Sequence, residues 1–308
     1  MSRTFHIAVV APSGYAADPA AFTRGLDHLR SLGHTVQDFS ANGTRDQRFA
    51  ASDAERVAQL HAAALDPHIE MVIALRGGYG LSRLLPSIDF NLLTRTVLEG
   101  GKRWVGHSDF TVVQLAMLAS AGAGSFAGPM ICDDFSRADL SEFTHQHFWQ
   151  CVTQDAYRID VEAQGNPVAR IEGTLWGGNL TMLCHLIGTP WMPTVQDGIL
   201  FIEDVNEHPY RVERMLLQLA HAGVLRQQRA IVLGDFSGYR LTEYDNGYDF
   251  NQMLSYLRVR FDIPILQGLP FGHMKDKLTL PVGARCVLDS SDHGFTMTMQ
   301  SYPSESGK

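Results

Sequence analysis

A serine at the start of a helical segment is the first residue in this sequence that could act as a nucleophile. The stretch "WVGHSDFT" (104–111) places Ser108 after a short apolar run and before a helical pattern. A strand–turn–helix serine has the geometry of a nucleophile elbow, and the N–H of Asp109 would lie at a helix N-terminus, which favours an oxyanion. Phe110 stands where the pattern G-x-S-x-G has its second glycine. Taken alone, the segment favours the simpler interpretation, in which Ser108 or Asp109 only caps the helix.

A glycine-rich turn, "RGGYG" (76–80), follows another short apolar run, "MVIAL" (71–75). Adjacent glycines let the backbone turn sharply and present N–H groups to an anion or an oxyanion. The turn is neither a dinucleotide fingerprint nor a P-loop, because it contains no G-x-G-x-x-G and no G-K-[ST] follows it. It is either a plain strand-to-helix connection or a ligand loop, since parallel sheets bind ligands at the carboxyl ends of their strands.

A serine nucleophile needs a base, and the base needs a carboxylate that orients it. His107 is adjacent to Ser108, but neighbouring side chains on a tight turn diverge, so it is a poor base. His273, in "LPFGHMKDK", lies in a predicted loop and is the best placed of the thirteen histidines, although a surface histidine is the simpler interpretation. Glu203 and Asp204 end a very apolar run, and alternation along a strand lets only one of them point into a given cleft.

Other candidate side chains are weaker. Ser13 and Ser237 also follow apolar runs, but no convincing helix start comes after either, so neither gains an oxyanion site at a helix terminus. His145 and His147 are two residues apart on a predicted helix and do not share a face, so we expect no metal pair there.

The elements that must position these residues alternate between strand and helix in the first half of the chain. Asp18 before Pro19 predicts one helix start, and Ser52 with Glu55 predicts a capping box at another. Strands separated by helical segments of about 10–15 residues imply right-handed βαβ units and a parallel sheet covered on both faces. The predicted strands are 7–11, 34–39, 71–75, 103–106 and 125–129.

The pattern changes near residue 150, where polar and apolar residues begin to alternate. Two more apolar runs follow, at 198–205 and 230–236, with a predicted helix between them that starts at Pro209 and ends by Gly223. We therefore expect two domains joined by a linker, the second with more β character. Their expected bounds are 1–150 for the first domain, 151–170 for the linker and 171–308 for the second domain.

Composition and charge argue against several classes of function. The 308 residues carry a formal net charge of −8 and no long run of Lys or Arg, which argues against nucleic-acid binding. The four cysteines lie far apart and form no zinc pattern, so they indicate reduced thiols. No apolar stretch approaches the ~18 residues of a membrane span, and the N-terminus shows no signal-peptide pattern. We expect a cytoplasmic globular protein that holds no metal.

Six motifs occur in the order found in a known family. They are "APSGY", "RGGYG", "GHSD", "GTLWGGNL", "GILFIEDVNEHPYRVERMLLQL" and "GLPFGH". On these motifs the sequence closely resembles the L,D-carboxypeptidases of bacterial peptidoglycan recycling (peptidase family S66), over nearly the whole chain. The resemblance implies an α/β fold: an N-terminal three-layer α/β/α domain with a parallel sheet, similar to class I glutamine amidotransferases, and a C-terminal swivelling β/α domain.

The resemblance also implies a serine carboxypeptidase that needs no cofactor and forms a homodimer. Its triad would fall on Ser108, Glu203 and His273, and its oxyanion donors would be the backbone N–H groups of Gly78 and Asp109. The family's substrates are murein tetrapeptides or anhydromuropeptides. The bond cleaved joins the L-centre of meso-diaminopimelate or lysine to the terminal D-alanine.

Such a substrate ends in a free carboxylate, so a cation or a group of backbone N–H donors should lie near the serine. Arg76 and Gly77 in "RGGYG" are the candidates for this contact. Two other functions stay open. A related immunity peptidase that cleaves microcin C-type peptide–nucleotides shares the triad, so only its substrate would distinguish it. A non-catalytic two-domain protein that binds a ligand in its cleft would retain binding without turnover.

Overall fold

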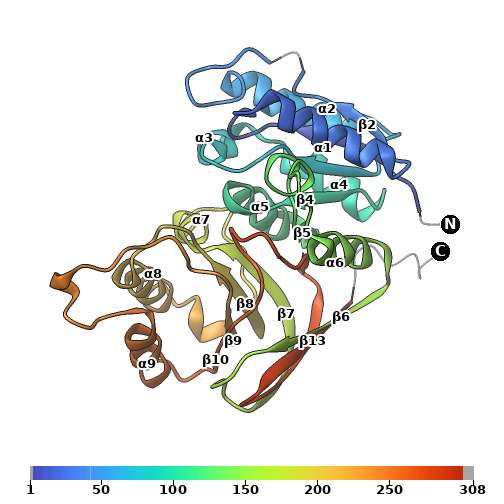
Figure 1. Cartoon of the computed structure of the whole chain (residues 1–308). Coiled ribbons are helices and arrows are strands. Elements are labelled where there is room, and N and C mark those ends of the chain that lie inside the picture. Colours follow the sequence, from blue (N-terminus) through green and yellow to red (C-terminus); the bar gives the residue numbers. More distant parts are fainter. Residues whose placement is uncertain (1–2, 42, 301–308) are drawn as a thin grey trace.

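Two β-sheets lie side by side in the computed structural model, which describes residues 3–41 and 43–300 (Figure 1). The first sheet has six strands, and all neighbouring pairs are parallel except the pair of β11 with β5. In spatial order the strands are β11 (Leu280–Val282), β5 (Ser125–Ala127), β4 (Arg103–Gly106), β3 (Met71–Ala74), β1 (His6–Val10) and β2 (Thr35–Asp38). The predicted parallel sheet of the first domain is confirmed.

Helices cover both faces of this sheet, which makes three layers (Figure 1). One layer contains α1 (Pro19–Ser31) and α6 (Glu142–Thr153), which meet where the rings of His28 and His145 are 4.9 Å apart. The other layer contains α2, α4 and α5, in which α4 packs against both neighbours. Their bounds are Asp53–Leu65, Phe90–Leu98 and Thr111–Ala121. Right-handed crossovers require this division, because the chain runs from β1 outward to β2 and then back across β1 to β3.

The helix starts follow from their capping residues. The Asp18 side chain accepts hydrogen bonds from the N–H groups of Ala20 and Ala21 at the start of α1. Ser52 and Glu55 form the predicted capping box at the start of α2. Both caps supply acceptors for N–H groups that have no partner within the helix.

The second sheet has seven strands and is mixed. Its first four strands are parallel and the remaining pairs are antiparallel. In spatial order they are β10 (Ile265–Gln267), β9 (Gln228–Leu233), β8 (Gly198–Glu203), β7 (Ala169–Asn179), β12 (Arg285–Ser291), β13 (Gly294–Gln300) and β6 (Ala156–Glu162). The helices are α7 (Leu180–His185), α8 (Pro209–His221) and α9 (Phe250–Arg260).

The two halves exchange segments in a way that the expected domain bounds miss. The expected linker 151–170 contains β6, which pairs along its whole length with β13 of the second sheet. Conversely β11, from the expected second domain, leaves that domain and pairs with β5 at the edge of the first sheet. The chain therefore crosses between the two halves more than once, and the linker expectation is wrong at β6.

Several short elements connect the longer helices and strands. Among them are α3 (Leu81–Leu84) and a π-helical turn, η3 (Ile131–Phe135). The other short turns are η1 (Leu85–Ser87), η2 (Ser108–Phe110), η4 (Leu225–Gln227) and η5 (Glu243–Asp245). Strands β3, β4 and β8 are buried along their whole length, as expected for strands covered on both faces. Within the described residues, no helix has the length and apolar character to cross a membrane.

Candidate active site

Ser108 is the first residue of η2, two positions after the last residue of β4, in the strand–turn–helix position that the sequence indicated. Its φ of 61° is unusual for a residue with a side chain and is typical of strained functional turns. The missing second glycine has a local explanation. A Cβ at Gly106 would lie 2.7 Å from the Phe110 ring, so the glycine two positions before the serine makes room for the aromatic residue two positions after it.

The structure brings three of the predicted site residues together, although His273 lies 165 positions after Ser108 in the sequence. His273, in the loop between β10 and β11, has its Nε2 3.0 Å from Ser108 Oγ. Its other ring nitrogen, Nδ1, is 2.7 Å from Oε2 of Glu203, the last residue of β8. Ser108 thus comes from the first domain, while Glu203 comes from the second sheet.

We call the hydrogen-bonded set Ser108, His273 and Glu203 the relay. The hydrogen-bond directions within the relay follow from the chemistry of the groups. A carboxylate can only accept, so the Nδ1–H of His273 donates to Glu203. In the neutral imidazole Nε2 then carries the lone pair and accepts from the Ser108 hydroxyl. Glu203 is fully buried, whereas the side chain of His273 is 25% exposed. The arrangement can therefore remove a proton from Ser108 at a position that a substrate can reach.

The pKa values of the two histidines near Ser108 are shifted in opposite directions. Burial alone would lower the pKa of His273, but its hydrogen bond to Glu203 and the charge of that carboxylate raise it above the ordinary value. His107 is completely buried, and burial lowers its pKa well below the ordinary value. Its Nδ1 is 3.0 Å from the carbonyl oxygen of Gly128. His107 is thus held neutral beside the relay, and its Nδ1 is engaged with Gly128. Both observations agree with the prediction that His107 is a poor base.

The "RGGYG" turn lies against the serine. A Cβ on Gly77 would be 2.8 Å from both Cβ and Oγ of Ser108 and 3.6 Å from the Asp109 backbone nitrogen. Gly78 follows with a φ of 120°, a conformation that residues with side chains rarely adopt. Strands β3 and β4 are neighbours, so the loops after them meet at one edge of the sheet. The two predicted oxyanion donors, at Gly78 and Asp109, come from these two loops.

The Asp109 side chain has a role that the sequence did not indicate. Its Oδ2 accepts hydrogen bonds from the Ser13 hydroxyl at 2.7 Å and from the N–H of Leu81 at 3.0 Å. The carboxylate is buried, and its two hydrogen bonds tie the "APSGY" turn and the residue that follows "RGGYG" to the position after Ser108. Burial is the main reason that its pKa is raised. Ser13, a rival nucleophile in the sequence, thus serves as a donor to this carboxylate.

Asn179, the last residue of β7, hydrogen-bonds to Glu203, the carboxylate of the relay. Its Nδ2 donates to Glu203 Oε1 at 3.2 Å and to Asp204 Oδ1 at 3.0 Å. Asp204 also accepts from the N–H and the hydroxyl of Thr181 at 2.9 and 2.7 Å, so it has structural contacts and Glu203 alone enters the relay. The other rival serine, Ser237, donates to Asp235 at 2.6 Å.

A pocket of about 290 Å³ opens at Ser108 and His273. Its wall includes two arginines and one lysine, which makes it locally cationic in a chain of net charge −8. The other lining residues are Arg76, Gly77, Gly78, His107, Met130, Asp133, Arg137, Val205, Met274 and Lys277. Arg76 and Gly77, the sequence candidates for a carboxylate contact, both line it. Asp133, Arg137 and Lys277 were not singled out, because no motif marks them in the sequence.

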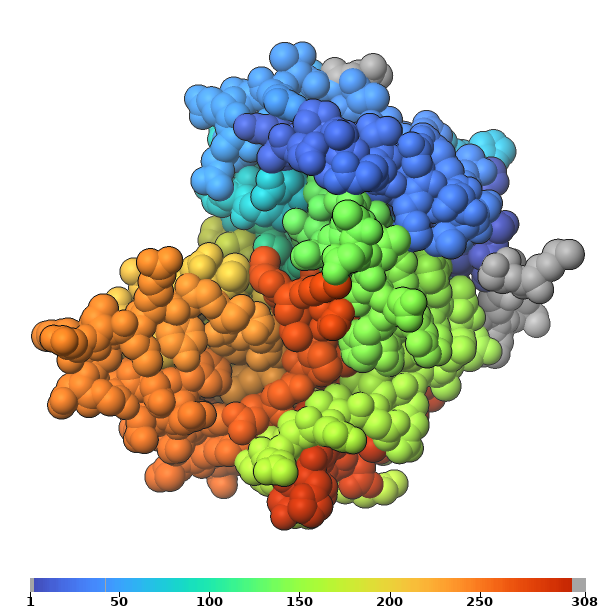
Figure 2. Space-filling model, in the orientation of Figure 1, coloured from blue at the N-terminus to red at the C-terminus, as the bar shows by residue number. Residues whose placement is uncertain are grey.

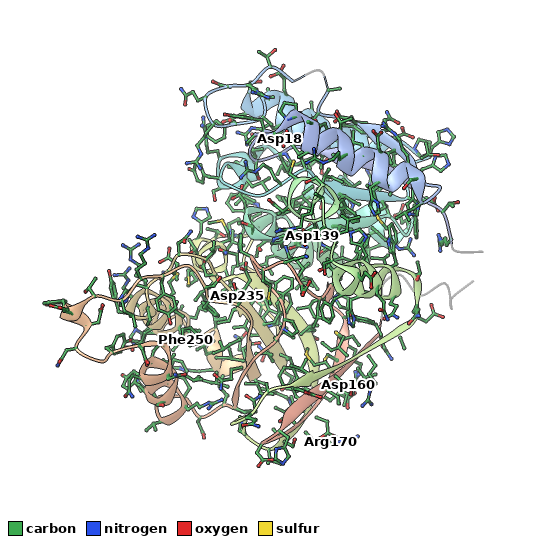
Figure 3. The ribbon with its side chains drawn as sticks, viewed as in Figure 1. Asp18, Asp139, Asp160, Arg170, Asp235 and Phe250 are labelled. Atoms are coloured by element: carbon green, nitrogen blue, oxygen red, sulfur yellow. The ribbon has the colours of Figure 1, made fainter. Side chains whose placement is uncertain are left out.

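The loop after His273 is fastened to the first domain. Lys277 forms a buried ion pair with Asp134 of η3 at 2.7 Å, and its N–H donates to the Thr144 hydroxyl at 2.9 Å. Lys275 pairs with Asp139, which lies at the boundary between the two halves (Figure 3). In Figure 2 the red-orange segment that contains this loop lies against the green segment that contains α6. These contacts hold the histidine of the relay against the domain that carries the serine.

The pH dependence of catalysis follows from the raised pKa of His273. The base must be neutral to accept the Ser108 proton, so kcat/KM should fall as the pH drops through a value above 6.5. Glu203→Gln should lower both the rate and the pKa of this acid limb, because the charge that stabilises imidazolium is lost. A pH–rate profile of both proteins measures the shift. An acid limb that stays in place in the variant would contradict the assigned pairing.

A methyl group at Gly77 should impair the oxyanion site. Gly77→Ala would force the turn away from Ser108, because its Cβ would meet the serine side chain at 2.8 Å. Misplacing one oxyanion donor should lower kcat by about 10²–10³ with a smaller effect on KM. Gly188→Ala is the control, since no atom lies within 4 Å of the added Cβ there, even though that glycine, unlike Gly77, has a positive φ. Equal kcat values for the two variants would contradict the prediction.

Fold and site together define a class of protein: a two-domain serine peptidase in which Ser108 of the first domain and Glu203 of the second sheet are joined through His273. Family comparison agrees with this class. The N-terminal domain of the LD-carboxypeptidases matches residues 7–128, and the C-terminal domain of the same family, peptidase S66, matches residues 172–288. The chain therefore belongs to the LD-carboxypeptidase family.

Three similar proteins illustrate the range of the family. A crystal structure of muramoyltetrapeptide carboxypeptidase from Oxalobacter formigenes is 51% identical, with a TM-score of 0.92 over 97% of this chain and 100% of that chain. A probable murein peptide carboxypeptidase from Bacillus subtilis (strain 168) is 29% identical over 93% of this chain and 89% of its own length. The microcin C7 self-immunity protein MccF of Escherichia coli is 25% identical over 91% and 88%, respectively.

Proposed function

We propose that the protein is an L,D-carboxypeptidase that removes the terminal D-alanine from murein tetrapeptides. The observation that carries the proposal is the Ser108–His273–Glu203 relay, with distances of 3.0 and 2.7 Å, at the wall of a cationic pocket. The 51% identity with a muramoyltetrapeptide carboxypeptidase supports the substrate class. The bond cleaved would join the L-centre of a diamino acid, meso-diaminopimelate or lysine, to D-alanine.

In the acylation step Ser108 Oγ attacks the carbonyl carbon of this bond while His273 Nε2 takes its proton. The buried Glu203 carboxylate keeps the ring in the required tautomer and stabilises the imidazolium that forms. The N–H groups of Gly78 and Asp109 are the donors for the oxyanion of the tetrahedral intermediate. Imidazolium then protonates the amine of D-alanine, which leaves, and the peptide remains as an ester on Ser108.

In the deacylation step water replaces the amine. His273 takes a proton from the water as it attacks the ester, and the same backbone donors receive the second oxyanion. When this intermediate collapses, the proton returns to Ser108 and the shortened peptide leaves with a free carboxylate. Arg76, half-buried in the pocket wall, is the proposed partner for the carboxylate of the departing D-alanine.

The experiment is to incubate the protein with a murein tetrapeptide and to follow D-alanine release by mass spectrometry. Release by the wild type, and its loss on alanine substitution of Ser108, Glu203 or His273, is the expected result. If neither the wild type nor Ser108→Ala turned over any peptide, but both bound one, a binding protein would be the better description.

The alternative function is peptidase immunity to a microcin C-type peptide–nucleotide, for which the 25% identity with MccF is the specific observation. The relay does not discriminate, because both reactions need an acylated serine. An acyl-aminoadenylate analogue in the same assay separates them: its hydrolysis, without hydrolysis of the tetrapeptide, would favour immunity.

We also infer that the protein acts in the cytoplasm as a homodimer, on the strength of its resemblance to the family. Light scattering coupled to size-exclusion chromatography tests the dimer: a molar mass near 34.1 kDa would contradict it. Fractionation of cells that express the protein tests its location.

A further inference from the structure

The charged groups in the pocket wall fall into two sets. Lys277 has its cation in a buried ion pair with Asp134, and His273 faces Glu203. The remaining charged side chains are those of Arg76, Arg137 and Asp133. Within residues 3–41 and 43–300, none of these three forms an ion pair with another side chain. The pocket therefore holds two cations and one anion that are available to a ligand.

Two of these three groups are held next to each other. Asp133 lies in the π-helical turn η3, and Arg137 follows it by four residues. The Nε–H of Arg137 donates to the backbone oxygen of Asp133 at 2.6 Å, which fixes the guanidinium beside this turn; no other described residue hydrogen-bonds to its terminal nitrogens. Single π-helical turns often occur at functional sites. Arg76 approaches from another loop of the same domain, after β3, and the one hydrogen bond of its Nη1 within the described residues is to the carbonyl oxygen of Tyr15, at 3.5 Å.

These charges match one end of the proposed substrate. In meso-diaminopimeloyl-D-alanine, the D-alanine has one carboxylate, and the side chain of the diamino acid ends in a carbon with both an ammonium and a carboxylate. That gives two anions and one cation, the complement of Arg76, Arg137 and Asp133. A lysine side chain ends in an ammonium alone and would leave one arginine without a partner.

We propose that Asp133 and Arg137 form a subsite for the zwitterionic end of the diamino acid side chain, and that Arg137 selects diaminopimelate over lysine. The proposal rests on the proposed function. Asp133 receives the ammonium, and Arg137 receives the carboxylate on the same carbon. Arg76 remains for the carboxylate of D-alanine, which both kinds of substrate carry. The pair is a specificity determinant and takes no part in the bond-breaking steps.

The test compares three tetrapeptides that differ only at the third residue: meso-diaminopimelate, its amide at the side-chain carboxylate, and lysine. For the wild type, kcat/KM should be highest for the first. Arg137→Gln should lower it about tenfold for diaminopimelate and leave the amide and lysine peptides unchanged. Asp133→Asn should lower it about tenfold for all three, since each carries the ammonium. Arg170→Gln, at the far end of the second domain (Figure 3), is the control and should change none.

Each other outcome has a definite meaning. Equal losses on all three peptides in Arg137→Gln, or none, would overturn the subsite while leaving the proposed function intact. No D-alanine release from any peptide by the wild type would overturn the proposed function. In that case calorimetric binding of the three peptides to the Ser108→Ala variant, with and without Arg137→Gln, still decides the subsite: affinities that do not depend on the side-chain carboxylate would overturn it.

Discussion

Ser108→Ala should abolish D-alanine release, with a fall in kcat of at least about 10⁴. The hydroxyl is the atom that His273 Nε2 faces at 3.0 Å, and no other hydroxyl is placed against that nitrogen among the described residues. Removal of one member of a relay that acts as a unit removes most of its contribution, and only oxyanion stabilisation and binding remain. Single-turnover and steady-state assays with the tetrapeptide measure the loss.

The matched control for this variant is Ser13→Ala. Ser13 is another serine at this edge of the sheet, but its hydroxyl donates to Asp109 and does not face a base. It should lower the rate far less than Ser108→Ala, although loss of a donor to the buried Asp109 carboxylate should cost about 1–3 kcal/mol of stability, whereas Ser108→Ala should stay within about 1 kcal/mol of the wild type. A Ser108→Ala protein with wild-type turnover would show that the nucleophile is a different group.

Of the substitutions proposed here, Lys277→Met should lower the free energy of unfolding the most. The ion pair of Lys277 with Asp134 is almost completely inaccessible, so the substitution would leave a buried carboxylate without its cation. Such a loss costs about 3–5 kcal/mol in the free energy of unfolding. Burial already raises the pKa of Asp134, and without Lys277 it should rise further, so the penalty should be largest at neutral to alkaline pH. Denaturant unfolding at two pH values measures it.

Two further variants isolate the cause. Lys275→Met removes the cation of an exposed pair in the same loop and should cost less than about 1 kcal/mol. The double variant Lys277→Met with Asp134→Leu should recover most of the stability, because it removes both buried charges. The prediction fails if Lys277→Met is as stable as Lys275→Met. Since the charge of Lys277 also lowers the pKa of His273, the acid limb of the variant should move to higher pH.

Much of the first domain could be predicted because its signals are local. The strand Arg103–Gly106 coincides with the predicted bounds, and the capping box of Ser52 with Glu55 is present as expected. Local signals also placed a serine and a glycine turn at the ends of two neighbouring strands. They could not decide whether Ser108 is a helix cap or a nucleophile. That choice depends on Glu203 and His273, which lie 95 and 165 positions further along the chain.

The remaining features depend on contacts that leave no local signature. β6 alternates in burial like any edge strand, and only its pairing with β13 assigns it to the second sheet. Asp109 reads as a helix-capping residue, whereas its carboxylate joins two loops that are distant in sequence. Lys277 and Asp134 are ordinary charged residues in the sequence, and their burial follows from the way the two halves close on each other.

The return of β11 to the first sheet has a mechanical consequence. The loop that carries His273 is bonded to the second domain at Phe271, whose carbonyl oxygen accepts from the N–H of Asp235 at 2.8 Å, and to the first domain at Lys275 and Lys277. Any hinge motion between the halves must therefore strain the few residues around His273. The relay is assembled in this arrangement of the two halves, so separating them would disconnect His273 from Ser108 or from Glu203 and leave the serine without its base.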